Sequence, residues 1–149
     1  MKRWNKGILL VLGMLTVMAV ALSGCGAPAS SSARPAAAAP ATAATLDLPV
    51  TIDAKTVNEL RNNPDVFIID VREDYEYAAG HIAGTTLIPL GQLSSRLSEI
   101  PKDKTVVAVC RSGNRSGQAT ELLRRAGYDA HNMAGGMIGW EQAGLDIQR

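Results

Sequence analysis

Residues 105–115 read Thr-Val-Val-Ala-Val-Cys-Arg-Ser-Gly-Asn-Arg, and this stretch decides the fold. Its first five residues are apolar or β-branched without a break, which predicts a strand buried on both faces, as in a parallel sheet. A helix is predicted at residues 116–126, with Gly127 as its C-terminal cap. Cys110 therefore stands where a buried strand ends and the connection to a helix begins.

Short strands and helices alternate through the rest of residues 46–149. Strands are predicted at 50–52, 66–69, 86–88 and 128–133. Helices are predicted after Asp53, a suitable N-cap, around Leu93 and Leu97, and at 137–143. This alternation indicates one α/β domain with a mostly parallel central sheet and helices on both faces.

The N-terminal 24 residues have the pattern of an export signal rather than of a folded domain. Lys2, Arg3 and Lys6 are followed by an uncharged apolar run at residues 7–22, shorter than the roughly 20 residues of a membrane-spanning helix. The run ends in Leu-Ser-Gly-Cys25, which resembles the lipobox of bacterial lipoproteins. The alternatives are an ordinary secretory signal or a short anchor helix in which Cys25 has no role.

The lipobox resemblance implies cleavage before Cys25 and acylation of its thiol by fatty acids such as palmitate. Several acyl chains on one residue give stable membrane attachment, whereas a single chain binds only reversibly. Residues 26–45 are almost entirely Ala, Pro and Ser, which predicts a flexible tether with a span of roughly 25 Å. The expected location is the bacterial cell envelope, on the extracytoplasmic face of a membrane.

Charge and cysteine content exclude several classes of function. The whole chain has a net charge of +1, but residues 46–149 contain 11 Lys and Arg against 14 Asp and Glu, a net charge of −3. An acidic domain lacks the clustered basic charge of a nucleic-acid-binding protein. No cluster of His and Cys has metal-ligand spacing, so neither a metal nor another cofactor is expected. If Cys25 is acylated, the chain has no second thiol to pair with Cys110.

The loop that follows the predicted strand is suited to hold an anion. It consists of Arg111, Ser112, Gly113, Asn114 and Arg115. Backbone amides at a helix N-terminus and two arginines lower the pKa of a neighbouring thiol, which increases the fraction of reactive thiolate. Gly113 permits the positive φ that a tight loop often needs. The alternative is an inert buried Cys110 beside surface arginines.

Five sequence motifs resemble the rhodanese family. The loop at 110–115 is similar to its active-site loop of Cys, four residues and Arg, and residues 70–73 read Asp-Val-Arg-Glu, as in that family. The other motifs are residues 76–84, Ile88-Pro89, and Gly135-Gly136 with Trp140. The resemblance covers roughly residues 47–146 and departs from the family only at Ala83 and Thr85-Thr86.

The resemblance implies a sulfurtransferase in which Cys110 attacks the outer sulfur of thiosulfate or another sulfane donor and becomes a persulfide. The amides of residues 111–115 would hold the terminal sulfur until cyanide or a thiol accepts it. Arg115 would pair with Asp70 in the family's ion pair between loops, Arg72 would brace neighbouring loops, and Arg111 would recruit the anionic donor. The expected partners are therefore small molecules and, through the lipid, the membrane.

Two other functions stay open. The fold could serve as a non-catalytic binding or sulfur-sensing module. A phosphatase or arsenate reductase is less suited, because those enzymes have five residues between Cys and Arg, whereas four separate Cys110 from Arg115. Outside the loop, a hydrogen bond that stabilises a turn is expected for His81, a surface position for His131 and core packing for Trp140.

Overall fold

The structure is a computed structural model that describes residues 46–149. The predicted signal at 1–24, the predicted lipid site at Cys25 and the predicted tether at 26–45 lie outside the described residues and stay predictions. Between residues 46 and 149, no helix combines the length and the apolar character needed to cross a membrane.

Strands and helices alternate along the described chain, as predicted, and form a five-stranded sheet. The strands are β1 (Thr51–Ile52), β2 (Val66–Asp70), β3 (Thr86–Leu87), β4 (Thr105–Val109) and β5 (Ala130–Met133). The helices are α1 (Ala54–Leu60), α2 (Asp74–Ala79), α3 (Asn114–Arg125) and α4 (Gly136–Gln142), with two 3-10 helices, η1 (Leu90–Ser95) and η2 (Leu97–Glu99). The strand order is β1-β5-β4-β2-β3, and all pairs are parallel, which confirms the predicted fold class.

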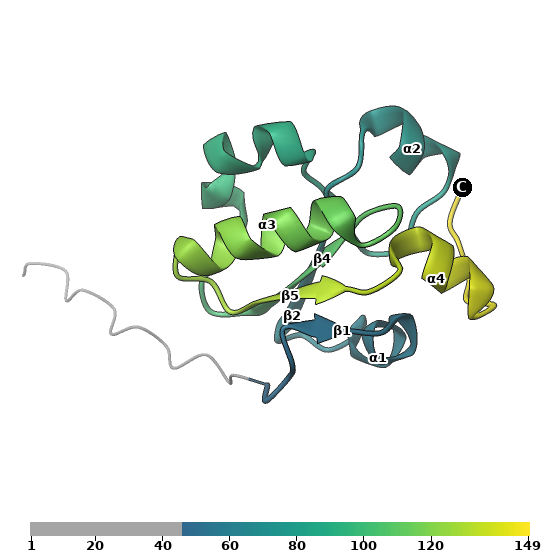
Figure 1. Ribbon diagram of the computed structural model, residues 1–149, viewed down its shortest axis with the longest axis horizontal. Helices are drawn as coiled ribbons and strands as arrows, with labels where there is room; N and C mark the ends of the chain where they lie inside the picture. The colour runs from purple at the N-terminus through teal and green to yellow at the C-terminus, as the bar shows by residue number, and fades with distance from the viewer. Residues whose placement is uncertain (1–45) are drawn as a thin grey trace, which may run out of the picture. The chain divides into compact units, whose positions relative to one another are not determined.

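Helices cover both faces of the sheet, so β4 is buried along its whole length. In Figure 1, α3 and the 3-10 helices lie on one side of the strands and α1 on the other. Each face has its own hydrophobic cluster, with Leu93 and Leu123 on the α3 side and Val57 and Trp140 on the opposite side. Because the sheet is parallel, the carboxyl ends of β2, β4 and β5 meet at one edge, where Figure 1 shows α2, α4 and the loop after β4.

Local capping explains where several helices begin and end. The Asp53 side chain accepts a hydrogen bond from the amide of Thr56 (2.9 Å), which confirms it as the N-cap of α1. The α2 helix, which was not predicted, has a reciprocal capping box between Glu73 and Glu76. The helix expected around Leu93 and Leu97 is instead a pair of 3-10 helices, a common form for a short connection.

The structure corrects the predicted surface position of His131. Its side chain is buried, with Nδ1 2.8 Å from the carbonyl oxygen of Pro49 and Nε2 3.1 Å from Oδ1 of Asp129. The physical reason is that β5 lies between β1 and β4 rather than at an edge of the sheet. His81 does make a turn hydrogen bond, with Nδ1 3.0 Å from the carbonyl oxygen of Tyr77, and Trp140 packs in the core.

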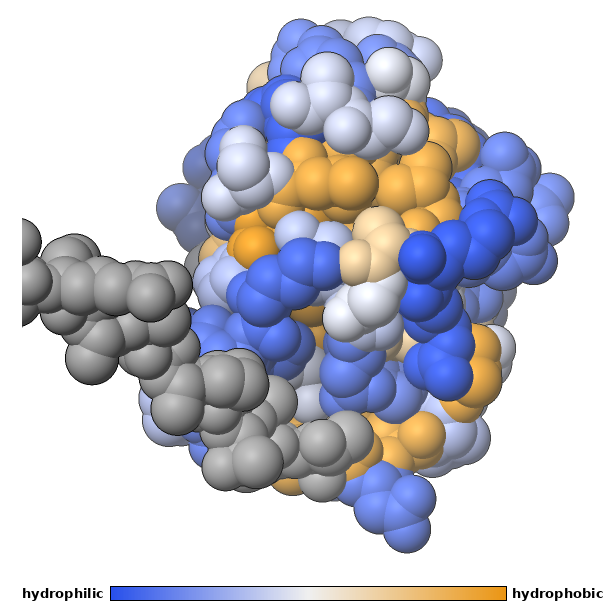
Figure 2. Space-filling view, turned by 90° about the vertical axis from the view of Figure 1, so that its left-hand side faces the viewer, coloured by the Kyte–Doolittle hydropathy of each residue, from blue (hydrophilic) through white to orange (hydrophobic). Residues whose placement is uncertain are grey.

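On the face that Figure 2 shows, hydrophilic side chains surround several hydrophobic areas, a broad one above the centre and smaller ones lower down. A small domain cannot cover its whole surface with polar atoms, so an apolar area of this kind is ordinary. The candidate site lies at the carboxyl edge of the sheet, where Cys110 follows β4.

Candidate active site

Cys110 follows β4 directly and lies beneath the loop that leads into α3. The residue is 1% exposed, and its Sγ accepts a hydrogen bond from the amide of Gly113 at 3.1 Å. The Ser116 hydroxyl lies 3.3 Å from the same sulfur. Gly113 adopts a φ of 97°, a left-handed conformation that turns its amide toward the sulfur at little cost for a residue without a Cβ.

The hydrogen-bond donors around Cys110 Sγ favour its thiolate form. Burial of the thiol raises its pKa, whereas hydrogen bonds from the Ser116 hydroxyl and from the amides of Ser116, Ser112 and Gly113 lower it. The hydrogen bonds together outweigh burial, so the pKa of Cys110 lies below its ordinary value. Thiolate rather than thiol is the attacking species in sulfur chemistry, so Cys110 is prepared to act as a nucleophile.

Ser116 connects Cys110 with Asn132, a residue that the sequence did not single out. The Ser116 hydroxyl lies 2.6 Å from Oδ1 of Asn132 and 3.3 Å from Cys110 Sγ. A hydroxyl has one proton, so it donates to only one of these acceptors at a time. Ionisation of Cys110 favours donation to sulfur, because hydrogen bonds to a charged acceptor are stronger.

The first turn of α4 fixes the backbone of the cysteine loop. The amide of Met137 donates to the carbonyl oxygen of Cys110 (2.8 Å), and the amide of Ile138 donates to that of Arg111 (3.0 Å). These contacts use amides at a helix start, which have no partner within the helix. Gly136 lies against the loop so closely that a Cβ there would overlap the Cys110 carbonyl oxygen. The glycine pair of the sequence motif therefore permits contact between two backbones.

The expected ion pair between Arg115 and Asp70 is wrong. Arg115 instead donates from Nη1 and Nη2 to the two carboxylate oxygens of Glu76, at 2.7 and 2.8 Å. This bidentate contact holds the pKa of Glu76 to about 2 and raises that of Arg115 above its usual range. Arg115 has this partner because α2 brings Glu76 beside the loop, whereas Asp70 already forms an ion pair with Arg72.

Asp70 and Arg72 form a buried pair next to this contact. Asp70 accepts from Nε and Nη2 of Arg72, with a shortest distance of 2.7 Å, and both side chains are at most 6% exposed. The same guanidinium donates to the carbonyl oxygens of Glu76 (3.2 Å) and Gly80 (2.9 Å). Arg72 thus connects the end of β2 with the middle of α2 and with its C-terminal cap, as expected for a residue that braces neighbouring loops.

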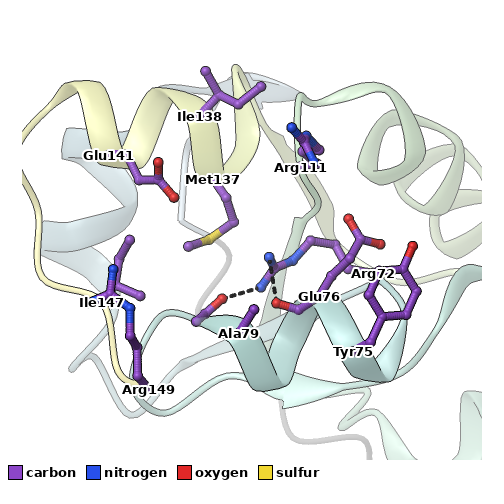
Figure 3. Close-up of a pocket in the computed structure, with 11 residues that line it drawn as sticks. Arg72, Tyr75, Glu76, Ala79, Arg111, Met137, Ile138, Glu141, Ile147 and Arg149 are labelled. Carbon is purple, nitrogen blue, oxygen red and sulfur yellow. Dashed lines mark hydrogen bonds between the residues drawn. The ribbon is translucent and has the colours of Figure 1, made fainter.

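Arg111 differs from the other two arginines because its side chain is exposed and has no ion-pair partner among residues 46–149. It lines a pocket with a volume of about 330 Å³ between α2, α4 and the segment at 147–149. The lining comprises Arg72, Tyr75, Glu76, Ala79, Gly80, Arg111, Met137, Ile138, Glu141, Ile147 and Arg149. Figure 3 shows Arg111 on one side of the pocket and Arg149 on the opposite side.

The described residues contain no arrangement that would hold a metal. No group of three or more His, Cys, Asp or Glu side chains between residues 46 and 149 could bind an ion together. Among the described residues, the site consists of one thiol of lowered pKa held by hydrogen-bond donors, with Arg115 fixed by Glu76 and Arg111 exposed. Such an arrangement suits nucleophilic attack on an anionic compound.

Glu76→Gln should lower stability at neutral pH by about 1–2 kcal/mol, a value discounted for the solvent exposure of Arg115. Because folding lowers the pKa of Glu76 from 4.5 to about 2, its stabilisation is complete above pH 4.5 and disappears as the pH falls toward 2. Thermal unfolding of both proteins across this range is the measurement, and the two melting temperatures should converge at low pH.

Glu99→Gln is the matched control, because Glu99 also pairs with an arginine but is largely exposed. Its effect at neutral pH should be much smaller than that of Glu76→Gln. Combining Glu76→Gln with Arg115→Ala should give less than the sum of the single effects. Strict additivity would show that Glu76 and Arg115 do not interact in solution.

A family model for the rhodanese-like domain matches residues 53–143 of this chain. A sulfurtransferase of Allochromatium vinosum is 41% identical over 98 residues, which are 64% of this chain and 92% of that protein. An uncharacterized protein of Synechocystis sp. is 40% identical over 97 residues, which are 64% of this chain and 54% of that protein. The chain thus spans about half the length of the second relative.

A solved structure of a rhodanese-related protein from Thermoplasma volcanium has the same fold. The match has a TM-score of 0.63 at 29% identity and covers 67% of this chain and 98% of that one. Residues 53–143, which the family model matches, contain the strand that leads into Cys110, the loop and the glycine pair at the start of α4.

Proposed function

The chain belongs to the rhodanese-like domain family, and on that basis we propose that it transfers sulfane sulfur from a donor such as thiosulfate to cyanide or a thiol through a Cys110 persulfide. The observation that carries this proposal is the pair of hydrogen bonds on Cys110 Sγ, from Gly113 and Ser116. They stabilise the Cys110 thiolate, which is the attacking group of the first step and the leaving group of the second.

The reaction divides into two sulfur transfers. In the first, the Cys110 thiolate attacks the outer sulfur of thiosulfate, a bond forms between the two sulfurs, and sulfite leaves with the electron pair of the broken bond. In the second, cyanide or a thiolate attacks the outer sulfur of the persulfide and the Cys110 thiolate leaves. Covalent catalysis of this kind replaces one difficult step by two easier ones.

A non-catalytic binding or sulfur-sensing module is the second candidate. It would use the same cradle to hold a persulfide without passing it on, because a fold alone does not determine activity. An oxyanion enzyme is disfavoured by the four residues between Cys110 and Arg115, which form a smaller ring than five would. The two candidates differ in one assay: a sulfurtransferase forms thiocyanate from thiosulfate and cyanide, whereas a sensing module does not.

Arg111→Ala should raise the KM for thiosulfate about five- to tenfold with a smaller change in kcat. The reason is that Arg111 is exposed beside Cys110 and has no carboxylate partner in the described chain, so its charge is available to a dianion. Steady-state formation of thiocyanate at varied thiosulfate is the measurement.

Arg125→Ala is the matched control, because Arg125 is an exposed arginine in the last turn of α3. It removes the same charge from the domain and should leave the KM for thiosulfate within about twofold, since exposed charges far from the site are screened. A collapse of kcat in Arg111→Ala with an unchanged KM would assign Arg111 to the chemical step instead of donor capture.

We further propose that the domain acts at the extracytoplasmic face of a bacterial membrane, attached through acylated Cys25. The support is the order of a basic start, a 16-residue apolar run and Leu-Ser-Gly-Cys25. Cells that express Cys25→Ser should accumulate the uncleaved chain and lose incorporation of a clickable fatty acid. Labelling that persists in Cys25→Ser would overturn the lipid attachment.

A further inference from the structure

We propose that Asn132 is a positioning residue for sulfur transfer: its side-chain amide turns so that the Ser116 hydroxyl donates to Cys110 Sγ while that sulfur is charged and to Asn132 while it is not. This inference rests on the proposed function and adds a residue to its mechanism. Its basis is a row of three polar atoms, in which Ser116 Oγ lies 3.3 Å from Cys110 Sγ and 2.6 Å from Asn132 Oδ1.

The sheet and α3 hold the backbone of all three residues. Cys110 follows β4, Ser116 lies in the first turn of α3, and Asn132 lies in β5, which pairs with β1 on one side and with β4 on the other. The amide of Asn132 donates to the carbonyl oxygen of Val50 at 2.8 Å. Its side chain lies against the start of α3, where a Cβ added to Gly117 would come within 3.7 Å of Nδ2. The hydrogen bonds of the row can therefore change through side-chain torsions, without movement of the backbone.

The Ser116 hydroxyl depends on these two neighbours because it is shielded from water. Ser116 is 0% exposed, so bulk water does not reach its hydroxyl. Within residues 46–149, Cys110 Sγ and Asn132 Oδ1 are the hydrogen-bond partners of this group. A buried hydroxyl left without a partner lowers stability, so its single proton points to one of the two.

While Cys110 Sγ is uncharged, the proton of Ser116 points to Asn132. A separation of 2.6 Å between two oxygens is that of a hydrogen bond donated by the hydroxyl. An uncharged sulfur is a weak acceptor and does not compete with an amide oxygen. The inner sulfur of a persulfide belongs to this state as well, because the charge of a persulfide lies on its outer sulfur.

When Cys110 is a thiolate, the same proton turns to the sulfur, because hydrogen bonds to a charged acceptor are stronger. The oxygens of Ser116 and Asn132 would then repel each other. Rotation of the last torsion of Asn132, which has a broad and roughly two-fold profile in asparagine, replaces Oδ1 by Nδ2. Asn132 then donates to Ser116 and Ser116 donates to the thiolate, a chain in which each hydrogen bond strengthens the next. Ser116 keeps its proton throughout.

This rotation directs the hydroxyl to Cys110 in the two steps in which its sulfur is charged. The thiolate attacks in the first transfer and leaves in the second, and Sγ is uncharged in the persulfide between them. Burial raises the pKa of Cys110, and the Ser116 hydroxyl is the hydrogen bond that lowers it most. The amide of Gly113 also donates to Sγ, but it belongs to the backbone and does not turn away. Ser116 and Asn132 are thus the adjustable donors of the site.

Asn132→Asp tests the rotation, because a carboxylate has the same shape as the amide but cannot donate. It should hold the Ser116 proton permanently and leave the thiolate without that donor. The new charge also repels the thiolate directly, so Ser116→Ala and the double variant are measured with it. Arg115, which attracts the thiolate and is paired with Glu76, is present in every protein compared.

The measurement is the rate of alkylation by iodoacetamide as a function of pH. The parent protein is the 149-residue chain with Cys25→Ser, in which Cys110 is the one thiol. Below the midpoints of both profiles, Asn132→Asp should react about tenfold more slowly than the parent, because only the thiolate reacts. The midpoint of its profile should lie at higher pH. When Ser116→Ala is already present, Asn132→Asp should slow the reaction no more than about threefold, the effect of the charge alone.

Asn132→Leu separates this role from a merely structural one. It removes the competing acceptor as well as the donor, so the Ser116 hydroxyl is left with the sulfur as its partner. We expect Asn132→Leu to react at least about fivefold faster than Asn132→Asp at the same pH. A residue that only filled space would give the opposite order, because aspartate resembles asparagine more closely than leucine does.

Asn62→Asp is the matched control, because it adds the same charge at an exposed turn between α1 and β2. Its rate should stay within about twofold of the parent. Equal slowing by Asn132→Asp with and without Ser116, or a slower reaction of Asn132→Leu than of Asn132→Asp, would overturn the inference. Alkylation needs no sulfur donor, so thiocyanate formation by the parent is measured separately. Its absence would overturn the proposed function, whereas normal thiocyanate formation with equal slowing would overturn only the role of Asn132.

Discussion

Cys110→Ser should reduce sulfur transfer from thiosulfate to cyanide by at least about 10³-fold, because it removes the nucleophile on which both steps depend. A serine hydroxyl is not ionised near neutral pH, so the hydrogen bonds from Gly113 and Ser116 have no anion to stabilise. Initial rates of thiocyanate formation by the wild type and the variant are the measurement.

Cys25→Ser is the matched cysteine control for this experiment. Cys25 is the predicted lipid site and lies outside the predicted domain at 46–149, so the purified variant should transfer sulfur at the wild-type rate. The Cys110→Ser protein should also unfold within about 5 °C of the wild type, a shift of roughly 1 kcal/mol, since the replacement is small. A Cys110→Ser protein that is folded and fully active would remove Cys110 from the mechanism.

Gly136→Ala should lower stability by about 3 kcal/mol or more and greatly reduce sulfur transfer. The added Cβ would overlap the carbonyl oxygen of Cys110 and lie 2.6 Å from the amide nitrogen of Ser112, so the loop or the start of α4 must move. Gly136 also has a φ of 54°, which adds a cost of about 1–2 kcal/mol for a residue with a side chain. Thermal unfolding and thiocyanate formation are the two measurements.

Gly84→Ala separates the steric overlap of a new Cβ from the conformational cost of a positive φ. Gly84 has a φ of 84°, but a Cβ there would meet nothing within 4 Å. This variant should therefore show only the conformational cost, about 1–2 kcal/mol, and retain sulfur transfer. Equal losses of stability and activity in Gly84→Ala and Gly136→Ala would show that contact between Gly136 and the loop is unimportant.

The sequence predicted the structure best where a local pattern of residues is compatible with only one conformation. The apolar run at Thr105–Val109 is buried throughout, so its composition was sufficient to predict a central parallel strand. Cys110 lies at the carboxyl end of that strand, as the order of strand, loop and helix predicted. Gly113 has the positive φ that its place in the loop suggested.

The sequence was least informative where partners are set by the packing of separate elements. Arg115 binds Glu76 because α2 crosses near the loop, and that short helix has too few apolar residues to be predicted from periodicity. Glu73 and Glu76 do form a capping-box pattern, which could have indicated it. The position of Arg149 in the pocket depends on the pairing of Gln148 with His81. These two residues are far apart in the sequence, so no local sequence pattern predicts their contact.

The intact mass of the protein after incubation with thiosulfate tests the central claim most directly. The account predicts that the wild type gains the mass of one sulfur atom, that added cyanide or thiol removes it, and that Cys110→Ser never gains it. A wild-type protein that takes up no sulfur from any sulfane donor, or a gain that persists in Cys110→Ser, would contradict a persulfide at Cys110.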